Sequence, residues 1–175
     1  MEKITKRILP LLMLTAACSQ GGQGDIISHL QTGEKLPEFT TWTTNMTNTG
    51  TENLKGKPSI IILFETTCPD CHAQLPEIER LHNTSGETVN VLAIARGEKA
   101  AAVTAFWKAF GYSMPVAAPG NRTIYDLFDR GSQTGVPQVY ISDTEGTVIG
   151  YADWKKTITS DEILTIIENH KTHQQ

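Results

Sequence analysis

The chain has 175 residues, of which 39% are hydrophobic and 19% charged, and its formal net charge is −4. This length favours one domain, and the apolar content suffices for a hydrophobic core, which argues against wholesale disorder. Eight prolines and fourteen glycines without a repeating period exclude collagen-like and low-complexity chains, and three cysteines are too few for a disulfide-built mini-protein.

The N-terminus has the layout of an export signal. Basic residues within 1–7 precede an apolar run over 8–14, and small residues then lead to Cys18. The apolar run is far shorter than the roughly 20 residues that a transmembrane helix needs. Residues 14–18 resemble a bacterial lipobox, in which the cysteine becomes the lipidated first residue of the mature chain. The alternative is an ordinary signal peptide with an incidental cysteine.

The export signal divides the chain into three predicted parts. We expect a lipoprotein signal peptide over 1–17, a lipid-anchored flexible spacer over 18–33 and one folded domain over 34–175. Removal of the signal leaves 12 of the 15 basic and 18 of the 19 acidic residues, a net charge of −6. No basic stripe is present, so nucleic acid is not an expected partner, and membrane attachment would depend on lipid.

These signals predict a periplasm-facing position in a bacterial cell envelope. Ser19, rather than an acidic residue, follows the expected lipidated cysteine. By resemblance to enterobacterial sorting, this favours the outer membrane over the inner membrane.

The central part of the chain alternates predicted strands and helices. Residues 59–64 form a continuous apolar run, typical of a strand covered on both faces, and residues 89–94 form a second such run. Apolar residues at helical spacing follow each run: Leu75, Ile78 and Leu81 after the first, and Val103, Phe106, Trp107 and Phe110 after the second. This series favours parallel pairing of the two strands. The aromatic stripe of the second helix is expected in the core.

Antiparallel elements flank this series. Alternating threonines over residues 37–53 predict a short hairpin near the start of the domain, and residues 139–151 predict a second hairpin. Thr159 and Glu162 have the spacing of a capping box, which predicts a closing helix. The expected fold class is therefore α/β, with a mixed central sheet sandwiched by helices.

Two cysteines lie where the first buried strand gives way to a helix, in the sequence Cys68-Pro69-Asp70-Cys71. On the first turn of a helix this spacing allows a disulfide, and unpaired backbone N–H groups favour a thiolate on the exposed cysteine. We expect Cys68 to attack a partner's disulfide and Cys71, one turn deeper, to resolve the mixed disulfide. The charge of Asp70 opposes a neighbouring thiolate, although it complements the helix N-terminus.

Around these cysteines the sequence resembles the TlpA/ResA-like branch of the thioredoxin superfamily, whose members are membrane-tethered thiol-disulfide oxidoreductases. The resemblance covers roughly residues 36–169 and is carried by segments 36–39, 54–58, 68–76, 135–143 and 145–146. It implies a thioredoxin-like three-layer sandwich with an N-terminal β-hairpin extension, and a cis Pro137 that faces the cysteine pair. It also implies no dissociable cofactor and no metal.

The resemblance suggests partners as well. Protein thiols and disulfides would be the clients, and a membrane redox partner would regenerate the pair. Relatives reduce apocytochrome cysteines during cytochrome maturation or otherwise maintain reduced thiols, so we expect a reductant. The Val136 backbone would pair with an extended client segment in the manner of strand addition. Pro69 and Asp70 would line the same client site.

The chain departs from the family pattern at three positions. Thr67 replaces the aromatic residue that many relatives carry before the first cysteine, and Ile62 replaces the acid that thioredoxins bury on the preceding strand. Gln74 stands where ResA-like members often have a glutamate. Glu65 is therefore a candidate general base for Cys71. The alternative is that Glu65 is a solvated carboxylate at the end of the strand.

Three rival functions use the same cysteines. With His72 the motif also matches the c-type haem pattern, with Met114 or Met46 as the opposing ligand. The isoleucine-rich strand before the motif disfavours this, and otherwise His72 is expected on the helix surface. A metal carrier would add one of four histidines: His29, His82, His170 or His173. A non-catalytic binding module would keep only a structural disulfide, which stabilises little in so small a ring.

Overall fold

The computed structural model describes residues 29–130 and 134–173. Its elements are β1 (Thr40–Trp42), β2 (Asn48–Gly50), the 3-10 helix η1 (Thr51–Leu54), β3 (Ser59–Phe64), α1 (Pro69–Ser85), β4 (Asn90–Ala95), α2 (Ala100–Phe110), β5 (Val116–Ala117), α3 (Thr123–Asp129), β6 (Gln138–Ser142), β7 (Val148–Asp153) and α4 (Ser160–Thr172). The predicted signal peptide, Cys18 and most of the predicted spacer lie outside the described residues. None of the helices in the described part combines the length and the apolar character needed to cross a membrane.

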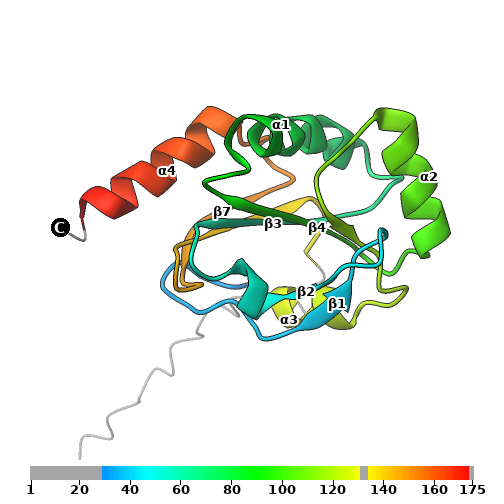
Figure 1. Ribbon diagram of the computed structural model, residues 1–175, viewed down its shortest axis with the longest axis horizontal. Coiled ribbons are helices and arrows are strands. Elements are labelled where there is room, and N and C mark those ends of the chain that lie inside the picture. The colour runs from blue at the N-terminus through cyan, green and yellow to red at the C-terminus, as the bar shows by residue number, and fades with distance from the viewer. Residues whose placement is uncertain (1–28, 131–133, 174–175) are drawn as a thin grey trace, which may run out of the picture.

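A mixed five-stranded sheet forms the middle layer, in the order β5-β4-β3-β6-β7. The central strand β3 pairs parallel with β4 and antiparallel with β6, and all of its residues are buried. Helices α1, α2 and α4 cover one face of the sheet, and α3 and the β1–β2 hairpin cover the other (Figure 1). The predicted three-layer α/β sandwich with an N-terminal hairpin is therefore confirmed.

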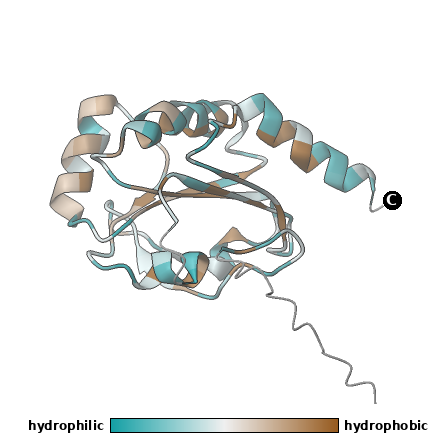
Figure 2. Cartoon of the chain, turned by 180° about the vertical axis from the view of Figure 1, so that it is seen from behind, coloured by the Kyte–Doolittle hydropathy of each residue, from teal (hydrophilic) through white to brown (hydrophobic). Residues whose placement is uncertain are grey.

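Helix α1 starts and packs as its sequence predicts. Pro69 lies in its first turn, where a missing backbone N–H removes no helical hydrogen bond. Leu75, Ile78 and Leu81 are fully buried against the sheet, and the apolar side of α1 faces the brown strands in Figure 2. The predicted capping box at the start of α4 is also present, between Thr159 and Glu162.

The aromatic stripe of α2 corrects one prediction. Val103 and Trp107 are buried as expected, but the side chain of Phe110 is 52% exposed. Phe110 packs on Phe106 and Tyr112 rather than on the sheet, with ring centroids 4.5 and 5.7 Å apart. Helix α2 therefore buries only one flank of its stripe, and the other flank lies at the surface.

Two elements had no predicted counterpart, β5 and α3. Strand β5 has two residues and pairs parallel with β4 through Val116 and Ala117. Helix α3 has seven residues, too few to show a periodic pattern, and it packs Ile124 and Phe128 against the sheet. Its position matters for function because it precedes the loop that leads to Pro137.

Candidate active site

Cys68 and Cys71 occupy the junction between β3 and α1. Cys68 is the N-cap residue of α1, and its Sγ accepts a hydrogen bond from the backbone N–H of Cys71 at 3.3 Å. Both cysteines are free thiols, Cys68 partly exposed and Cys71 fully buried. The structure thus places an outer and an inner sulfur at a helix N-terminus, where the helix dipole favours negative charge on the outer one.

The loop before β6 lies directly beside the outer sulfur. The Val136–Pro137 peptide bond is cis, as the resemblance implied. The thiol of Cys68 donates a hydrogen bond to the carbonyl oxygen of Val136 at 3.3 Å. Pro69 and Asp70, the other two predicted client-binding residues, are exposed at the start of α1. The fold thereby brings Cys68 and Val136, which are 68 positions apart in the sequence, into contact at the Cys68 sulfur.

The environment of Cys71 keeps its sulfur protonated. Burial raises the pKa of the Cys71 thiol above its ordinary value, and the hydrogen bond with Cys68 acts in the same direction. The negative charge of Glu65 also raises this pKa, whereas a hydrogen bond from the Glu65 backbone offsets part of the shift. Cys71 is therefore a neutral thiol in the reduced protein, and it must lose its proton before it can attack a mixed disulfide.

This raised pKa predicts a pH dependence of stability. Because the folded protein keeps a proton on Cys71 that the unfolded chain releases near the ordinary pKa of 9.0, the stability from the neutral thiol is complete below that pH. It is lost as the pH rises further, by up to about 1.4 kcal/mol per pH unit. Urea unfolding of the reduced protein and of Cys71→Ala, from neutral pH to about pH 10, measures the difference. Parallel stability curves for the two proteins would contradict this prediction.

Glu65 is paired with Arg96 rather than free in solvent. Arg96 Nε donates to Glu65 Oε1 at 2.5 Å, and both side chains are largely shielded from water. Arg96 Nη1 also donates to the Tyr125 hydroxyl at 3.3 Å and to the Thr134 carbonyl at 3.5 Å. The solvated carboxylate considered as an alternative is therefore not what the structure contains. The proposed role of Glu65 as a general base for Cys71 stays a prediction.

A buried polar network supports the loop that carries the cis proline. Asp129 is fully buried, and its Oδ1 accepts hydrogen bonds from the Thr134 N–H at 3.0 Å and from Gln138 Nε2 at 3.3 Å. The Tyr125 hydroxyl contacts the same oxygen at 3.1 Å and bonds the Thr134 carbonyl. Sequence reasoning missed this network, although Gln138, a polar residue that opens an apolar strand directly after Pro137, was a usable signal.

A second missed residue, Glu98, holds the segment between β3 and the cysteines. Its carboxylate accepts hydrogen bonds from the Thr66 backbone N–H, at 2.9 Å, and from the Thr66 hydroxyl. His72 Nε2 lies 2.7 Å from the Thr66 carbonyl oxygen, and its ring packs against Phe106 and Phe110. His72 is exposed on the first turn of α1, which agrees with the prediction that it lies on the helix surface.

Two of the three residues that depart from the family pattern, Ile62 and Gln74, are buried, whereas Thr67 is exposed. Ile62 is fully buried in β3. Gln74 is buried, and its amide bonds both backbone groups of Ile158, at 2.8 and 2.9 Å. Gln74 thus ties α1 to the segment before α4 instead of handling protons. Met114 and Met46, considered as haem ligands, lie apart, one buried beneath Trp107 and the other 76% exposed.

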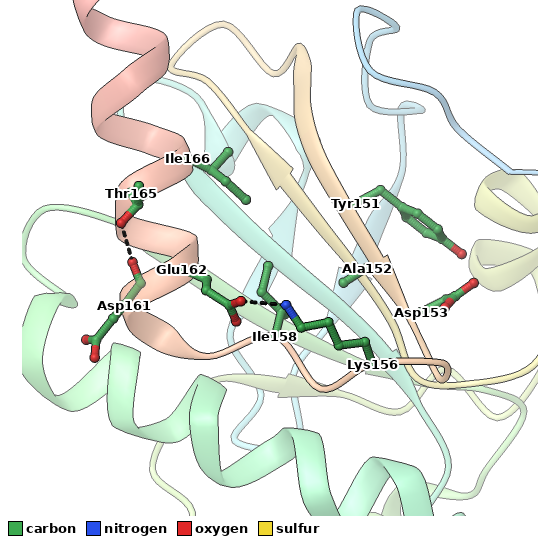
Figure 3. A pocket seen from close by; sticks show the side chains of 9 residues that line it. All are labelled: Tyr151, Ala152, Asp153, Lys156, Ile158, Asp161, Glu162, Thr165 and Ile166. Carbon is green, nitrogen blue, oxygen red and sulfur yellow. Dashed lines mark hydrogen bonds and ion pairs between the residues drawn. The ribbon is translucent and has the colours of Figure 1, made fainter.

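A hollow of about 680 Å³ lies between β7 and α4, with Ala152, Ile158 and Ile166 among its apolar lining (Figure 3). The ion pair between Lys156 and Glu162 joins the two sides of this hollow. Neither cysteine lines this hollow.

In the described part of the chain, no three His, Cys, Asp or Glu side chains lie close enough together to hold a metal ion. Of the two cysteine sulfurs, that of the partly exposed Cys68 is the more accessible.

Known proteins share the family and the fold of this chain. A family model described as Redoxin matches residues 31–167. The chain belongs to the Redoxin family. The expected relationship to the thioredoxin superfamily is thus confirmed, and the matched residues include both cysteines and the cis proline.

Individual relatives agree with the family. The thiol-disulfide oxidoreductase ResA of Bacillus subtilis (strain 168) is 26% identical over 118 residues, which span 67% of this chain and 64% of that protein. A solved thiol:disulfide interchange protein of the thioredoxin family from Chlorobium tepidum has 24% identity and a TM-score of 0.65, covering 80% of this chain and 97% of that one. An exposed lipoprotein thioredoxin from Streptococcus pneumoniae has 19% identity and a TM-score of 0.64, covering 76% and 99%. These matches support a thiol-disulfide oxidoreductase with a thioredoxin-like fold.

Proposed function

We propose that this protein is an exported thiol-disulfide oxidoreductase that exchanges the Cys68/Cys71 pair with disulfides or dithiols of extracytoplasmic proteins. The observation that carries the proposal is the pairing of a partly exposed Cys68 with a buried Cys71 at a helix N-terminus, directly against the cis Val136–Pro137 loop. The Redoxin family and the ResA relatives support the same chemistry.

The exchange proceeds in two balanced steps when the protein acts as a reductant. The Cys68 thiolate attacks one sulfur of a client disulfide, forms a mixed disulfide and releases the other client sulfur as a thiolate. Cys71 then loses its proton and attacks Cys68 Sγ, which closes the Cys68–Cys71 disulfide and releases the second client thiolate. The client gains two electrons, and two protons convert its thiolates to thiols. A dithiol of a membrane redox partner would return the pair to its reduced form.

The geometry around Cys68 suits an extended client segment. The Val136 carbonyl oxygen accepts a hydrogen bond from the Cys68 thiol in the free protein, and it becomes available when the thiol loses its proton. A backbone N–H of the client is the natural replacement donor, as in strand addition. Pro69 and Asp70 are exposed in the first turn of α1, next to Cys68 in the sequence, where they would contact the client.

We expect the pair to work as a reductant. The resemblance of the sequence to the TlpA/ResA-like branch, whose members maintain reduced thiols, supports this direction. Redox titration against glutathione buffers, read by alkylation and mass spectrometry, should give a potential below roughly −200 mV. A value near roughly −120 mV, typical of a strong exported oxidant, would reverse the assigned direction.

A lipid anchor at Cys18 completes the proposal. The lipobox-like segment before Cys18 suggests it, and the similar protein from Streptococcus pneumoniae is an exposed lipoprotein. The anchor would keep the domain on the periplasm-facing side of a bacterial envelope, with the outer membrane favoured. Cys18→Ala should then move the protein from the membrane fraction to the soluble fraction. A wild-type protein that is already soluble would contradict the anchor.

A further inference from the structure

Trp154 lies beside the candidate client site, and no motif in the sequence predicts a role for it. It follows Asp153, the last residue of β7, and Asp153 pairs across the sheet with Gln138, which follows Pro137. The indole therefore lies at the end of the sheet where the cis-proline loop leads into β6. The residue is 48% exposed, so much of the indole is open to contact with a bound client.

The indole packs directly on Gly135. A Cβ atom on Gly135 would lie 3.1 Å from Trp154 Cδ1 and 3.3 Å from Nε1, closer than ordinary van der Waals contact. Glycine at position 135 thus allows the ring to approach the backbone of the loop. The Lys155 ammonium lies 5.8 Å from the ring centroid, where a cation–π contact helps to hold the indole while much of it stays open to solvent.

The indole and the reacting sulfur contact neighbouring residues of the cis-proline loop. Trp154 covers Gly135, and the next residue, Val136, holds Cys68 Sγ at 3.3 Å. Adjacent Cα atoms are about 3.8 Å apart, and residues of an extended strand advance by roughly 3.3 Å each. A client cysteine at Cys68 therefore places the side chain one or two residues away within reach of the indole.

We propose that Trp154 is a specificity-determining residue that contacts a large apolar side chain adjacent to the client cysteine. The half-exposed indole would bury both its own surface and that of an aromatic or branched aliphatic client residue. This inference rests on the proposed function. It adds a preference for clients whose cysteine is flanked by an apolar residue, and small polar neighbours would gain nothing from the contact.

The experiment uses two synthetic peptides that each carry one cysteine in a mixed disulfide with thionitrobenzoate. The peptides are identical except for a phenylalanine or a serine next to the cysteine. The readout is the ratio of their kcat/KM values with the reduced full-length protein. We expect wild-type protein to prefer the phenylalanine peptide by roughly tenfold. Trp154→Ala should bring the ratio close to one, and Trp154→Phe should keep most of it.

Trp42→Ala is the matched control, because Trp42 is also exposed but belongs to the β1–β2 hairpin (Figure 1). It should leave the ratio at the wild-type value. The inference is overturned if Trp154→Ala keeps the wild-type ratio, or if Trp42→Ala changes the ratio by as much. If wild-type protein reduces neither peptide, the proposed function itself fails. A wild-type protein that reduces both peptides equally overturns the role of Trp154 alone.

Discussion

Replacing Cys68 with serine is expected to reduce disulfide-reductase turnover by about a thousandfold or more. Serine keeps the size and the N-cap position of the residue, but its hydroxyl does not form an anion at neutral pH and cannot attack a disulfide. Cys71 is fully buried and keeps its proton, so it cannot take over the attack. Reduction of insulin with excess dithiothreitol measures the loss.

Thr67→Ala is the matched control for this substitution. Thr67 is the exposed residue immediately before Cys68, and it is not assigned to the exchange. The turnover of the Thr67→Ala variant should stay within about twofold of wild type, because isolated surface substitutions usually perturb a fold little. If Cys68→Ser retains a tenth of the wild-type rate or more, the attacking sulfur is misassigned. An equal loss in both variants would instead point to a general disturbance of the loop.

Asp129→Ala is expected to give the largest loss of stability. The substitution removes the buried acceptor of the Thr134 N–H and of the Gln138 amide. An unsatisfied buried donor costs about 1–3 kcal/mol, so we expect the free energy of unfolding to fall by roughly 3 kcal/mol. Because Thr134 belongs to the loop that carries Pro137, the loss should also loosen the wall of the client site. Urea unfolding measures the stability, and insulin reduction at a temperature where the variant is folded measures the second effect.

Asp126→Ala provides the comparison on the same helix. Its carboxylate is exposed and forms an ion pair with Arg122 at 3.3 Å, one turn away. Exposed pairs of this kind contribute at most about 1 kcal/mol, and often nothing measurable. Both variants replace an aspartate of the same helix with alanine, so a larger effect at position 129 isolates the buried hydrogen bonds. Equal stability of the two variants would show that the network is not a support for the loop.

The sequence predicted the elements whose signals are local. The six-residue apolar run of β3 and the helical spacing of Leu75, Ile78 and Leu81 each determine one element without distant contacts. The capping box of α4 is equally local, since Thr159 and Glu162 satisfy each other. The family resemblance added the cis bond at Pro137. These features placed both cysteines at the correct junction, one outer and one inner.

The features that the sequence did not predict depend on tertiary contacts. Phe110 has the spacing of a core residue, but only packing decides which flank of α2 meets the sheet. Asp129 reads as an ordinary polar residue at the end of a short helix, and its importance comes from partners in another segment. The contact between Trp154 and Gly135 likewise spans two loops, and no spacing rule reports it.

The most direct test of the account is to trap the mixed disulfide on full-length Cys71→Ser. This variant keeps the attacking sulfur and removes the resolving one, so client proteins should accumulate in disulfide linkage to Cys68. Mass spectrometry of the adducts from envelope extracts identifies the linked cysteine, with Cys68→Ser as the control that should yield none. Adducts on Cys68 alone are the predicted result. Equal capture by Cys68→Ser, or no adduct with either an extract or a model disulfide peptide, would contradict exchange through an outer attacking and an inner resolving cysteine.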